Sequence, residues 1–332
     1  MLMPEVLERV VRSAVRAPSL HNTQPWEVDV GHEGDRGWVD VRLDPARSLR
    51  HSDPLDREAT IGCGALVDHL VVAARREGLD VETKGPVPGR WLARVLLTRG
   101  AAPSVAEIEL SVAAVHRRSA RTALDDLPVD AALVDGLVRV VADARAHLLV
   151  LPPRSAAGDV VLRQVARAEA LATEDLVGLA EEEAWWGRAS GLATAAPRAD
   201  GVPVEEPWAG HPGAALGPGS RRFADRYPSP RGAAEHRAVL ALLTTPADQP
   251  GDWLTAGQAL SRLLLAATVG GLTASFATTV LENPTTRHEV VRSLGLVGAP
   301  QVLLQLGYGE PGARTARRPA PEPADDDLDD RG

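Results

Sequence analysis

Two stretches of this sequence, residues 59–82 and 255–276, follow the same plan. Each begins with small residues, continues as a long apolar helical pattern, closes with a Gly-Leu pair and passes into a strand pattern. A further strand pattern follows each of them at a distance, WLARVLLTRG in one half and PQVLLQLGYG in the other. One such match is common by chance, because buried helix–glycine–strand units recur in proteins. Two matches in the same order favour an internal duplication.

The rest of the chain alternates helical and strand patterns. Apolar residues at helical spacing predict helices, and short runs bounded by turn signals predict strands. The expected helices are 3–15, 57–77, 105–117, 131–144, 159–183 and 253–269, and the expected strands are 26–30, 38–43, 81–83, 92–98, 147–151, 274–278 and 302–308. The string Gly62-Cys63-Gly64 lacks the third glycine of a dinucleotide-binding fingerprint and opens a buried helix, which indicates close packing. Residues 187–235 are rich in Gly, Pro, Ala and Arg without a period, which predicts a long irregular excursion.

Charge and cysteine content argue against several classes of function. The formal net charge is −9, but residues 322–332 hold six acidic residues and one Arg, so the rest is only mildly acidic and has no basic stripe for nucleic acid. A single cysteine, Cys63, cannot form an internal disulfide, and the nine scattered histidines give no metal-site spacing.

Neither the N-terminus nor the longest uncharged stretch predicts membrane targeting. The first residues carry charges throughout and lack the apolar core and cleavage site of a signal peptide. Residues 263–281 are uncharged, but four Thr and the Gly270-Gly271 pair favour a buried helix, a turn and a buried strand over a membrane span. We therefore expect a cytoplasmic protein that binds neither nucleic acid nor membrane.

Two short segments resemble the signatures of a known family. APSLHNTQPW (17–26, the APS segment) resembles the APS-x-x-N-x-QPW motif of FMN-dependent nitroreductases, and HRRSARTALDDLPVD (116–130, the RRS segment) resembles their RRS-x-R loop. Ordinary members carry both motifs within one repeat, whereas each half of this chain keeps one. Together with SDPLDREATIGCGA (52–65), this arrangement is similar to the Acg-like branch of the family, in which two repeats are fused. The resemblance covers about residues 4–312.

The resemblance implies an α+β fold of two fused nitroreductase-like repeats, with mainly antiparallel sheets surrounded by helices, so that one chain imitates a dimer. The expected repeats are residues 1–103 and 104–312, followed by a basic and then acidic tail, 313–332, with partial order. One surviving copy of each motif implies a single FMN site across the two halves. The chain is expected to be a monomer, as a pseudo-dimer, or a weak homodimer.

The residues of the RRS segment suit a flavin mononucleotide. Guanidinium groups bind phosphate oxygens in bidentate fashion, and positive charge beside the flavin ring favours its reduced form. The resemblance implies FMN contacts from Arg117, Arg118, Ser119 and Arg121. Taken alone, the string is also typical of a solvated charged loop, and that alternative stays open.

The APS segment and the tail supply the other expected contacts. In the family the APS segment reaches the flavin from the opposite subunit, and amide side chains can hydrogen-bond the ring edge. Basic residues after the last strand bind the phosphate a second time. The residues implied are Pro18, which shapes the turn, Ser19, Asn22, Gln24, Arg317 and Arg318. The alternatives are a proline-punctuated helix exit and ordinary solvated charge.

Residues 185–230, which begin with Trp185-Trp186, are the expected lid, because a lid from the second repeat covers the flavin in the Acg-like branch. Packing of both tryptophans in a core is the alternative. Two functions follow from the resemblance. One is an FMN-binding oxidoreductase that transfers hydride from NAD(P)H to a nitroaromatic or quinone-like acceptor. The other is a flavin-sequestering protein with an occluded site. Neither requires a protein acid or base, so we expect no catalytic residue, and the only expected partners are a flavin and a small substrate.

Overall fold

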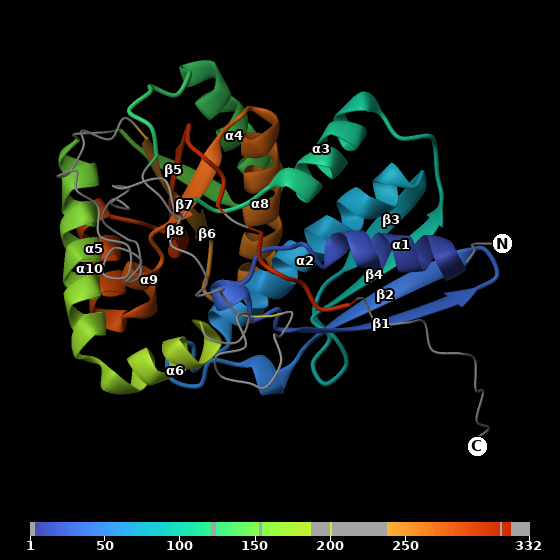
Figure 1. Ribbon diagram of the computed structural model, residues 1–332, viewed down its shortest axis with the longest axis horizontal. Helices are drawn as coiled ribbons and strands as arrows, with labels where there is room; N and C mark the ends of the chain where they lie inside the picture. The colour runs from blue at the N-terminus through green and yellow to red at the C-terminus, as the bar shows by residue number, and fades with distance from the viewer. Residues whose placement is uncertain are drawn as a thin grey trace.

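The structure is a computed structural model that describes residues 4–120, 124–152, 155–186, 200, 238–312 and 314–319. In these residues the chain forms two four-stranded antiparallel sheets. Two long helices, α2 (Arg57–Arg76) and α8 (Pro250–Val269), lie between the sheets and pack against each other (Figure 1). The expected α+β class with antiparallel sheets is confirmed.

The first sheet is built from the first half of the chain in the strand order β1-β2-β4-β3. Burial alternates along β4, which is the pattern of an antiparallel sheet with one face on a core. The apolar face of α1, at helical spacing, packs into the same core as α2. The elements are α1 (Pro4–Ala14), η1 (Leu20–Asn22), β1 (Trp26–Glu33), β2 (Arg36–Leu43), η2 (Pro45–Arg47), α2, β3 (Leu79–Lys84) and β4 (Ala93–Arg99).

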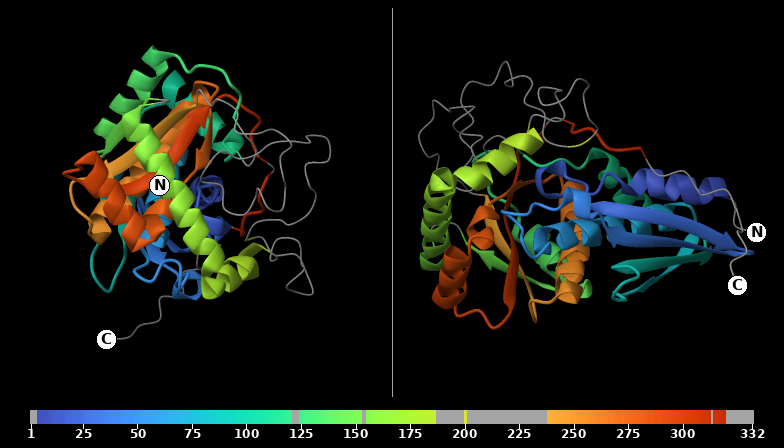
Figure 2. Two further views of the ribbon diagram at one scale, coloured as in Figure 1. Left: turned by 90° about the vertical axis from the view of Figure 1, so that its left-hand side faces the viewer. Right: turned by 90° about the horizontal axis from the view of Figure 1, so that it is seen from below.

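The second sheet, in the order β5-β6-β8-β7, is covered on both faces. One face packs on α4 and α8, and the other packs on α5, α9 and α10, which lie on the outside of the molecule (Figure 2). The elements are α3 (Val105–His116), α4 (Ala131–Asp143), β5 (His147–Leu151), α5 (Ala156–Glu174), α6 (Leu176–Trp186), β6 (Val239–Thr245), α8, β7 (Thr273–Phe276), α9 (Thr279–Glu282), α10 (Pro284–Leu294) and β8 (Ala299–Gly307).

The same succession of elements builds both halves. In the first half it is α1, β1, β2, α2, β3 and β4, and in the second it is α4, β5, β6, α8, β7 and β8. The strand orders match position by position. The second half adds α5 and α6 between its first two strands, and α9 and α10 between its last two. The two stretches that share one sequence plan therefore become the two central helices and the strands after them.

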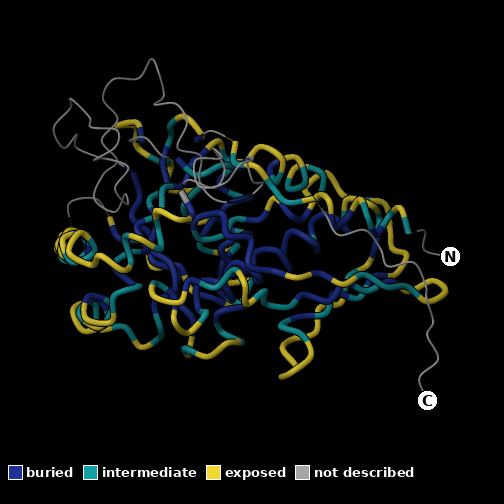
Figure 3. The backbone as a smooth tube through the Cα atoms, turned by 60° about the horizontal axis from the view of Figure 1, so that its bottom comes forward, coloured by how far each residue is buried: buried dark blue, intermediate teal, exposed yellow. Residues whose placement is uncertain are grey.

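The central helices touch backbone to backbone at a pair of glycines. A Cβ atom on Gly64 of α2 would lie 2.2 Å from the carbonyl oxygen of Leu254, and one on Gly257 of α8 would lie 2.0 Å from the carbonyl oxygen of Ile61. Only glycine fits at either position. Close packing at Gly64, expected from the sequence, is confirmed, and buried residues gather in the interior around these helices (Figure 3).

The contacts at this crossing are reciprocal. When Gly78-Leu79 is aligned with Gly271-Leu272, three residues of α2 fall opposite three of α8: Ile61 opposite Leu254, Gly64 opposite Gly257, and Asp68 opposite Ser261. Gly64 meets the carbonyl of Leu254, and Gly257 meets the carbonyl of Ile61, which is the residue equivalent to Leu254. The hydroxyl of Ser261 donates to Oδ2 of Asp68 over 2.7 Å, so equivalent positions also bond to each other. Reciprocity of this kind defines an isologous interface, here inside one chain.

Three expectations about secondary structure were wrong or incomplete. The helix expected over 159–183 is two helices, because the backbone of Asp175 leaves helical geometry and its Oδ1 accepts from the Gly178 amide at 3.1 Å to start α6. Strand β6 was not predicted, since all its residues are buried and the sequence shows no alternation. Helix α10 was also missed, although Asn283 caps its start by accepting from the Thr285 amide at 2.9 Å.

The interpretation of the uncharged stretch 263–281 is confirmed. It comprises the end of α8, a glycine turn in which Gly271 has a φ of +75°, and strand β7. Within the described residues, no helix combines the length and the apolar character that crossing a membrane requires.

Alanine at either crossing glycine is expected to destabilise the protein by about 2 kcal/mol, because a methyl group must force two backbones apart and the gain in helix propensity offsets only about 1 kcal/mol. Urea unfolding of G64A and G257A measures this. G251A on α8 is the matched control, because nothing lies within 4 Å of its new Cβ. Wild-type stability in both crossing variants would contradict the close approach.

Candidate functional site

The APS segment leaves α1 along a strained path into β1. His21, Asn22 and Gln24 have φ values of 48°, 55° and 50°, in the left-handed region that non-glycine residues rarely adopt. Such conformations cost about 1–3 kcal/mol each and persist only where surrounding contacts impose them. One such contact is the hydroxyl of Ser19, which accepts from the Gln24 amide at 3.0 Å.

The tail after β8 crosses this segment and holds it (Figure 1). The backbone amide of Arg318 donates to Oε1 of Gln24 over 2.9 Å, and its Nη2 donates to the carbonyls of Gln24 and Trp26 over 2.8 and 2.7 Å. The side-chain amide of Asn22 donates to the carbonyl of Ala316 over 3.0 Å. Two of the residues expected at the flavin ring therefore have their positions set by the tail.

The RRS segment reaches the same place from the second half. The side chain of Arg117 donates through Nη2 to the carbonyl of Arg16 over 3.4 Å, and Arg317 donates to that carbonyl over 3.3 Å. Two contacts hold the backbone of Ser119. It forms a parallel β-bridge with Ala274 of β7, and its carbonyl accepts from the Gly312 amide at 3.1 Å. Arg121 lies outside the described residues.

Arg117 has no counter-charge in the described part of the chain. Its side chain is buried, makes no ion pair there, and leaves Nε without a hydrogen-bond partner. Burial, and then the nearby charge of Arg118, lower the pKa of the Arg117 guanidinium to about 10. A buried charge without a partner is costly, so this geometry is suited to an anion.

Four arginines, Arg16, Arg117, Arg118 and Arg317, form what we name the arginine cluster. Arg16, Arg117 and Arg118 form no ion pair with a carboxylate among the described residues. The neighbouring Arg318 is different, because it lies 3.8 Å from the carboxylate of Asp44. The structure thus brings together most of the residues expected from three distant motifs, around an excess of positive charge.

Comparison with known proteins identifies the family. No family model matches the chain. A Mycobacterium tuberculosis H37Rv protein named "Putative NAD(P)H nitroreductase Rv3131" is 32% identical over 318 residues, which cover 92% of this chain and 85% of the relative. The chain belongs to the nitroreductase family. "Putative NAD(P)H nitroreductase acg" of the same strain is 29% identical over 339 residues, with 97% and 96% covered, in agreement with the Acg-like branch.

Solved nitroreductases show a more distant likeness. NfnB of Mycobacterium smegmatis, solved in complex with NADPH, has a TM-score of 0.39 and 15% identity, with 61% of this chain and 88% of that one covered. An FMN-bound nitroreductase of Bacteroides fragilis has a TM-score of 0.38 and 16% identity, with 63% and 93% covered.

Helix α6 of this nitroreductase fastens the second half onto the first. The carboxylate of Glu181 accepts from the amides of His51 and Ser52 at 3.2 and 2.9 Å, and Nε2 of His51 lies 2.6 Å from Oδ2 of Asp175. Trp185, expected at the base of the lid, is buried near the end of α6. The side chain of Trp186 and the remainder of residues 185–230, except Asp200, lie outside the described residues.

Beyond Trp186, Asp200 is the described residue of the expected lid, and it lies against the APS segment. Its carboxylate is buried and 2.8 Å from Nη1 of Arg47, and the same nitrogen donates to the carbonyl of Thr23 over 2.8 Å. Part of the expected lid thus reaches the segment that is expected to touch the flavin.

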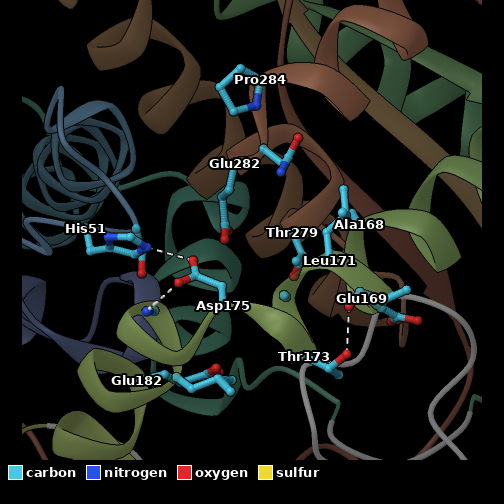
Figure 4. A pocket seen from close by; sticks show the side chains of 16 residues that line it. His51, Ala168, Glu169, Leu171, Thr173, Asp175, Glu182, Thr279, Glu282 and Pro284 are labelled. Carbon is cyan, nitrogen blue, oxygen red and sulfur yellow. Dashed lines mark hydrogen bonds and ion pairs between the residues drawn. The ribbon is translucent and has the colours of Figure 1, made fainter.

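A cavity of about 480 Å³ lies beside α6, between α5, α9 and the loop that holds His51 (Figure 4). Carboxylates dominate its charged lining, with Glu169, Asp175, Glu182 and Glu282 (Figure 4). No described residue of the APS segment or the RRS segment lines it. A negatively charged lining repels phosphate, so this cavity does not fit the phosphate end of a nucleotide.

Sequence analysis missed Arg16, Arg47 and Asp200, which make hydrogen bonds or ion pairs at the site, and the buried His69 of α2. Arg47 and Asp200 carried no signal, because their meeting depends on the tertiary fold. His69 carried one, since a histidine beside Asp68 in the apolar run LVDHLVVAA is unusual for a helix packed on all sides.

Replacing Glu181 with Ala is expected to undock α6, because two backbone amides lose their acceptor. Hydrogen–deuterium exchange should rise at least about tenfold in residues 49–56 and 176–186, as expected for a loss of about 1.4 kcal/mol of local protection. E174A is the control, since Glu174 is exposed at the end of α5. Equal exchange in both variants would show that α6 is held by other contacts.

Proposed function

We propose that this chain binds FMN and acts as an NAD(P)H-dependent oxidoreductase of nitroreductase type that reduces nitroaromatic or quinone-like acceptors. The observation that carries the proposal is the buried Arg117 guanidinium, whose Nε has no partner and which forms no ion pair among the described residues. The names of the curated relatives, NAD(P)H nitroreductases, support the same activity.

The residues present fit a flavin phosphate. Arg117, Arg118 and Arg317 would hold the phosphate, with Ser119 and Arg121 as the further contacts that the family motif implies. Charge-assisted hydrogen bonds to phosphate are short and strong, and they would balance a charge that is otherwise buried alone. Arg318 would act mainly by holding Gln24 in place.

The APS segment would orient the ring. Pro18 begins the turn, and the left-handed backbone at Asn22 and Gln24 holds both amides at fixed positions on the side of the arginine cluster. When bound, FMN supplies the hydride transfer between nicotinamide and acceptor. No described residue is needed as an acid or base, and the buried Cys63 is not a nucleophile, because burial raises the pKa of its thiol.

A flavin-sequestering protein is the second candidate. The ion pair between Arg47 and Asp200, together with the docked α6, favours a cover over the APS segment that limits access of a second substrate. Four further expectations stay predictions. They are a lid at residues 185–230 with Trp185 and Trp186 at its base, repeat boundaries at 103 and 104, a monomeric or weakly dimeric state, and a cytoplasmic location.

Arg117→Met is expected to weaken FMN binding by roughly 10- to 150-fold, because a charged hydrogen bond contributes about 1.5–3 kcal/mol. The same change should stabilise the flavin-free protein, since an unpaired buried charge is removed. Fluorescence titration with FMN and urea unfolding of the apoprotein measure the two effects. R139M is the control, at an exposed position of α4. Unchanged FMN affinity in R117M would favour the alternative interpretation, in which the RRS segment is a solvated charged loop.

Anaerobic mixing of the FMN-loaded protein with NADPH separates the two candidate functions. Loss of the yellow absorbance within seconds supports the oxidoreductase. A slow change that D200A accelerates at least tenfold supports sequestration, because that variant releases Arg47. Retention of FAD in preference to FMN, or two flavins per chain, would contradict the single FMN site.

A further inference from the structure

His69 is a buried side chain of α2 that the proposed function does not use. Its imidazole is 2% exposed, and neither ring nitrogen has a hydrogen-bond partner among the described residues. Leaving a buried polar group unsatisfied costs stability, so an exception of this kind requires a physical reason.

The helix face that carries His69 packs against two segments that supply residues of the arginine cluster. Two turns earlier, Gly62 on the same face packs against the side chain of Ser19 in the APS segment. One turn later, Val72 packs in a cluster with Ala113 of α3, and Arg117 follows Ala113 by one turn. Since residues one or two turns apart share a helix face, His69 lies between the start of the APS segment and the end of α3.

Four arginines lie near enough to His69 for their charges to act on it. They are Arg16 at the end of α1, Arg117 after α3, Arg317 in the tail and Arg262 on α8. Arg262 already has a partner, because its Nε donates to Oδ1 of Asp68 over 2.6 Å. Burial, and then these charges, hold the pKa of His69 well below its ordinary value, so the ring is neutral. A neutral imidazole has one donor nitrogen and one acceptor nitrogen.

Three buried atoms in this small region lack a partner: Nε of Arg117 and the two ring nitrogens of His69. Because the ring of His69 is neutral, one of its nitrogens can accept a hydrogen bond. The other ring nitrogen then carries the proton and needs an acceptor of its own. A phosphate oxygen held by the arginine cluster supplies it.

We propose that His69 is a phosphate-binding residue, whose neutral ring donates its N–H to an oxygen of the phosphate group. The inference rests on the proposed function for the identity of the ligand, FMN, and adds a residue that the family motifs do not contain. The neutral imidazole of His69 acts as a hydrogen-bond donor to the phosphate, and it makes no contact with the flavin ring.

The test compares FMN with riboflavin, which has the same ring without the phosphate. In His69→Leu, the Kd for FMN should rise roughly 10- to 100-fold, as for loss of a hydrogen bond to a charged group, while the Kd for riboflavin should change less than about twofold. His69→Asn, which keeps a donor and an acceptor, should recover part of the FMN affinity. His288→Leu, at an exposed position of α10, is the matched control and should change neither.

Two results would overturn the proposal. Equal losses for FMN and riboflavin would assign His69 a purely structural role, and unchanged FMN affinity in H69L would remove it from the site. If H69L fails to fold, the same comparison in H69N decides, with FMN loss alone in favour and equal loss against. If the wild type binds neither flavin, the proposed function fails. Titration with inorganic phosphate then tests separately whether His69 binds an anion. A shift of its ring ¹⁵N signals that R117M abolishes supports an anion site, and unmoved signals contradict it.

Discussion

The crossing of α2 and α8 at Gly64 and Gly257 is the contact on which the rest of the molecule depends. Because neither glycine can carry a side chain there, the two helices meet backbone to backbone through reciprocal contacts. Each helix carries its own four-stranded sheet, so this one contact sets the distance and orientation between the halves. The arrangement is that of a symmetric dimer interface, with the linker inside the chain.

The functional region uses the places where the symmetry fails. The APS segment follows α1, but no equivalent sequence follows α4. The RRS segment follows α3 and lies before the second half, and no equivalent sequence lies before the first half. The additional helices α5 and α6 occur in the second half alone, and α6 reaches back to the first. The arginine cluster therefore draws on segments that only one of the two halves supplies.

Charge distribution sets what that region can bind. The chain has a formal net charge of −9, yet carboxylates near the site already have partners, such as Asp44 with Arg47 and Asp68 with Arg262. Arg117 and Arg118, which form no ion pair among the described residues, therefore keep their positive charge in a partly buried setting where screening by solvent is weak. Local pairing, rather than total charge, makes an acidic protein suited to an anionic cofactor.

The sequence by itself determined the class of fold, the central helices, the family and the motifs, because these depend on local periodicity and on short strings. It determined neither strand β6, whose burial on both faces removes the alternation that identifies a strand, nor the break at Asp175. Tertiary structure alone decided that Arg318 holds Gln24, that Asp200 meets Arg47 and that His69 is buried without a hydrogen-bond partner among the described residues. The physical reason is that hydrogen bonds and charge depend on distance in space, and these partners are far apart along the chain.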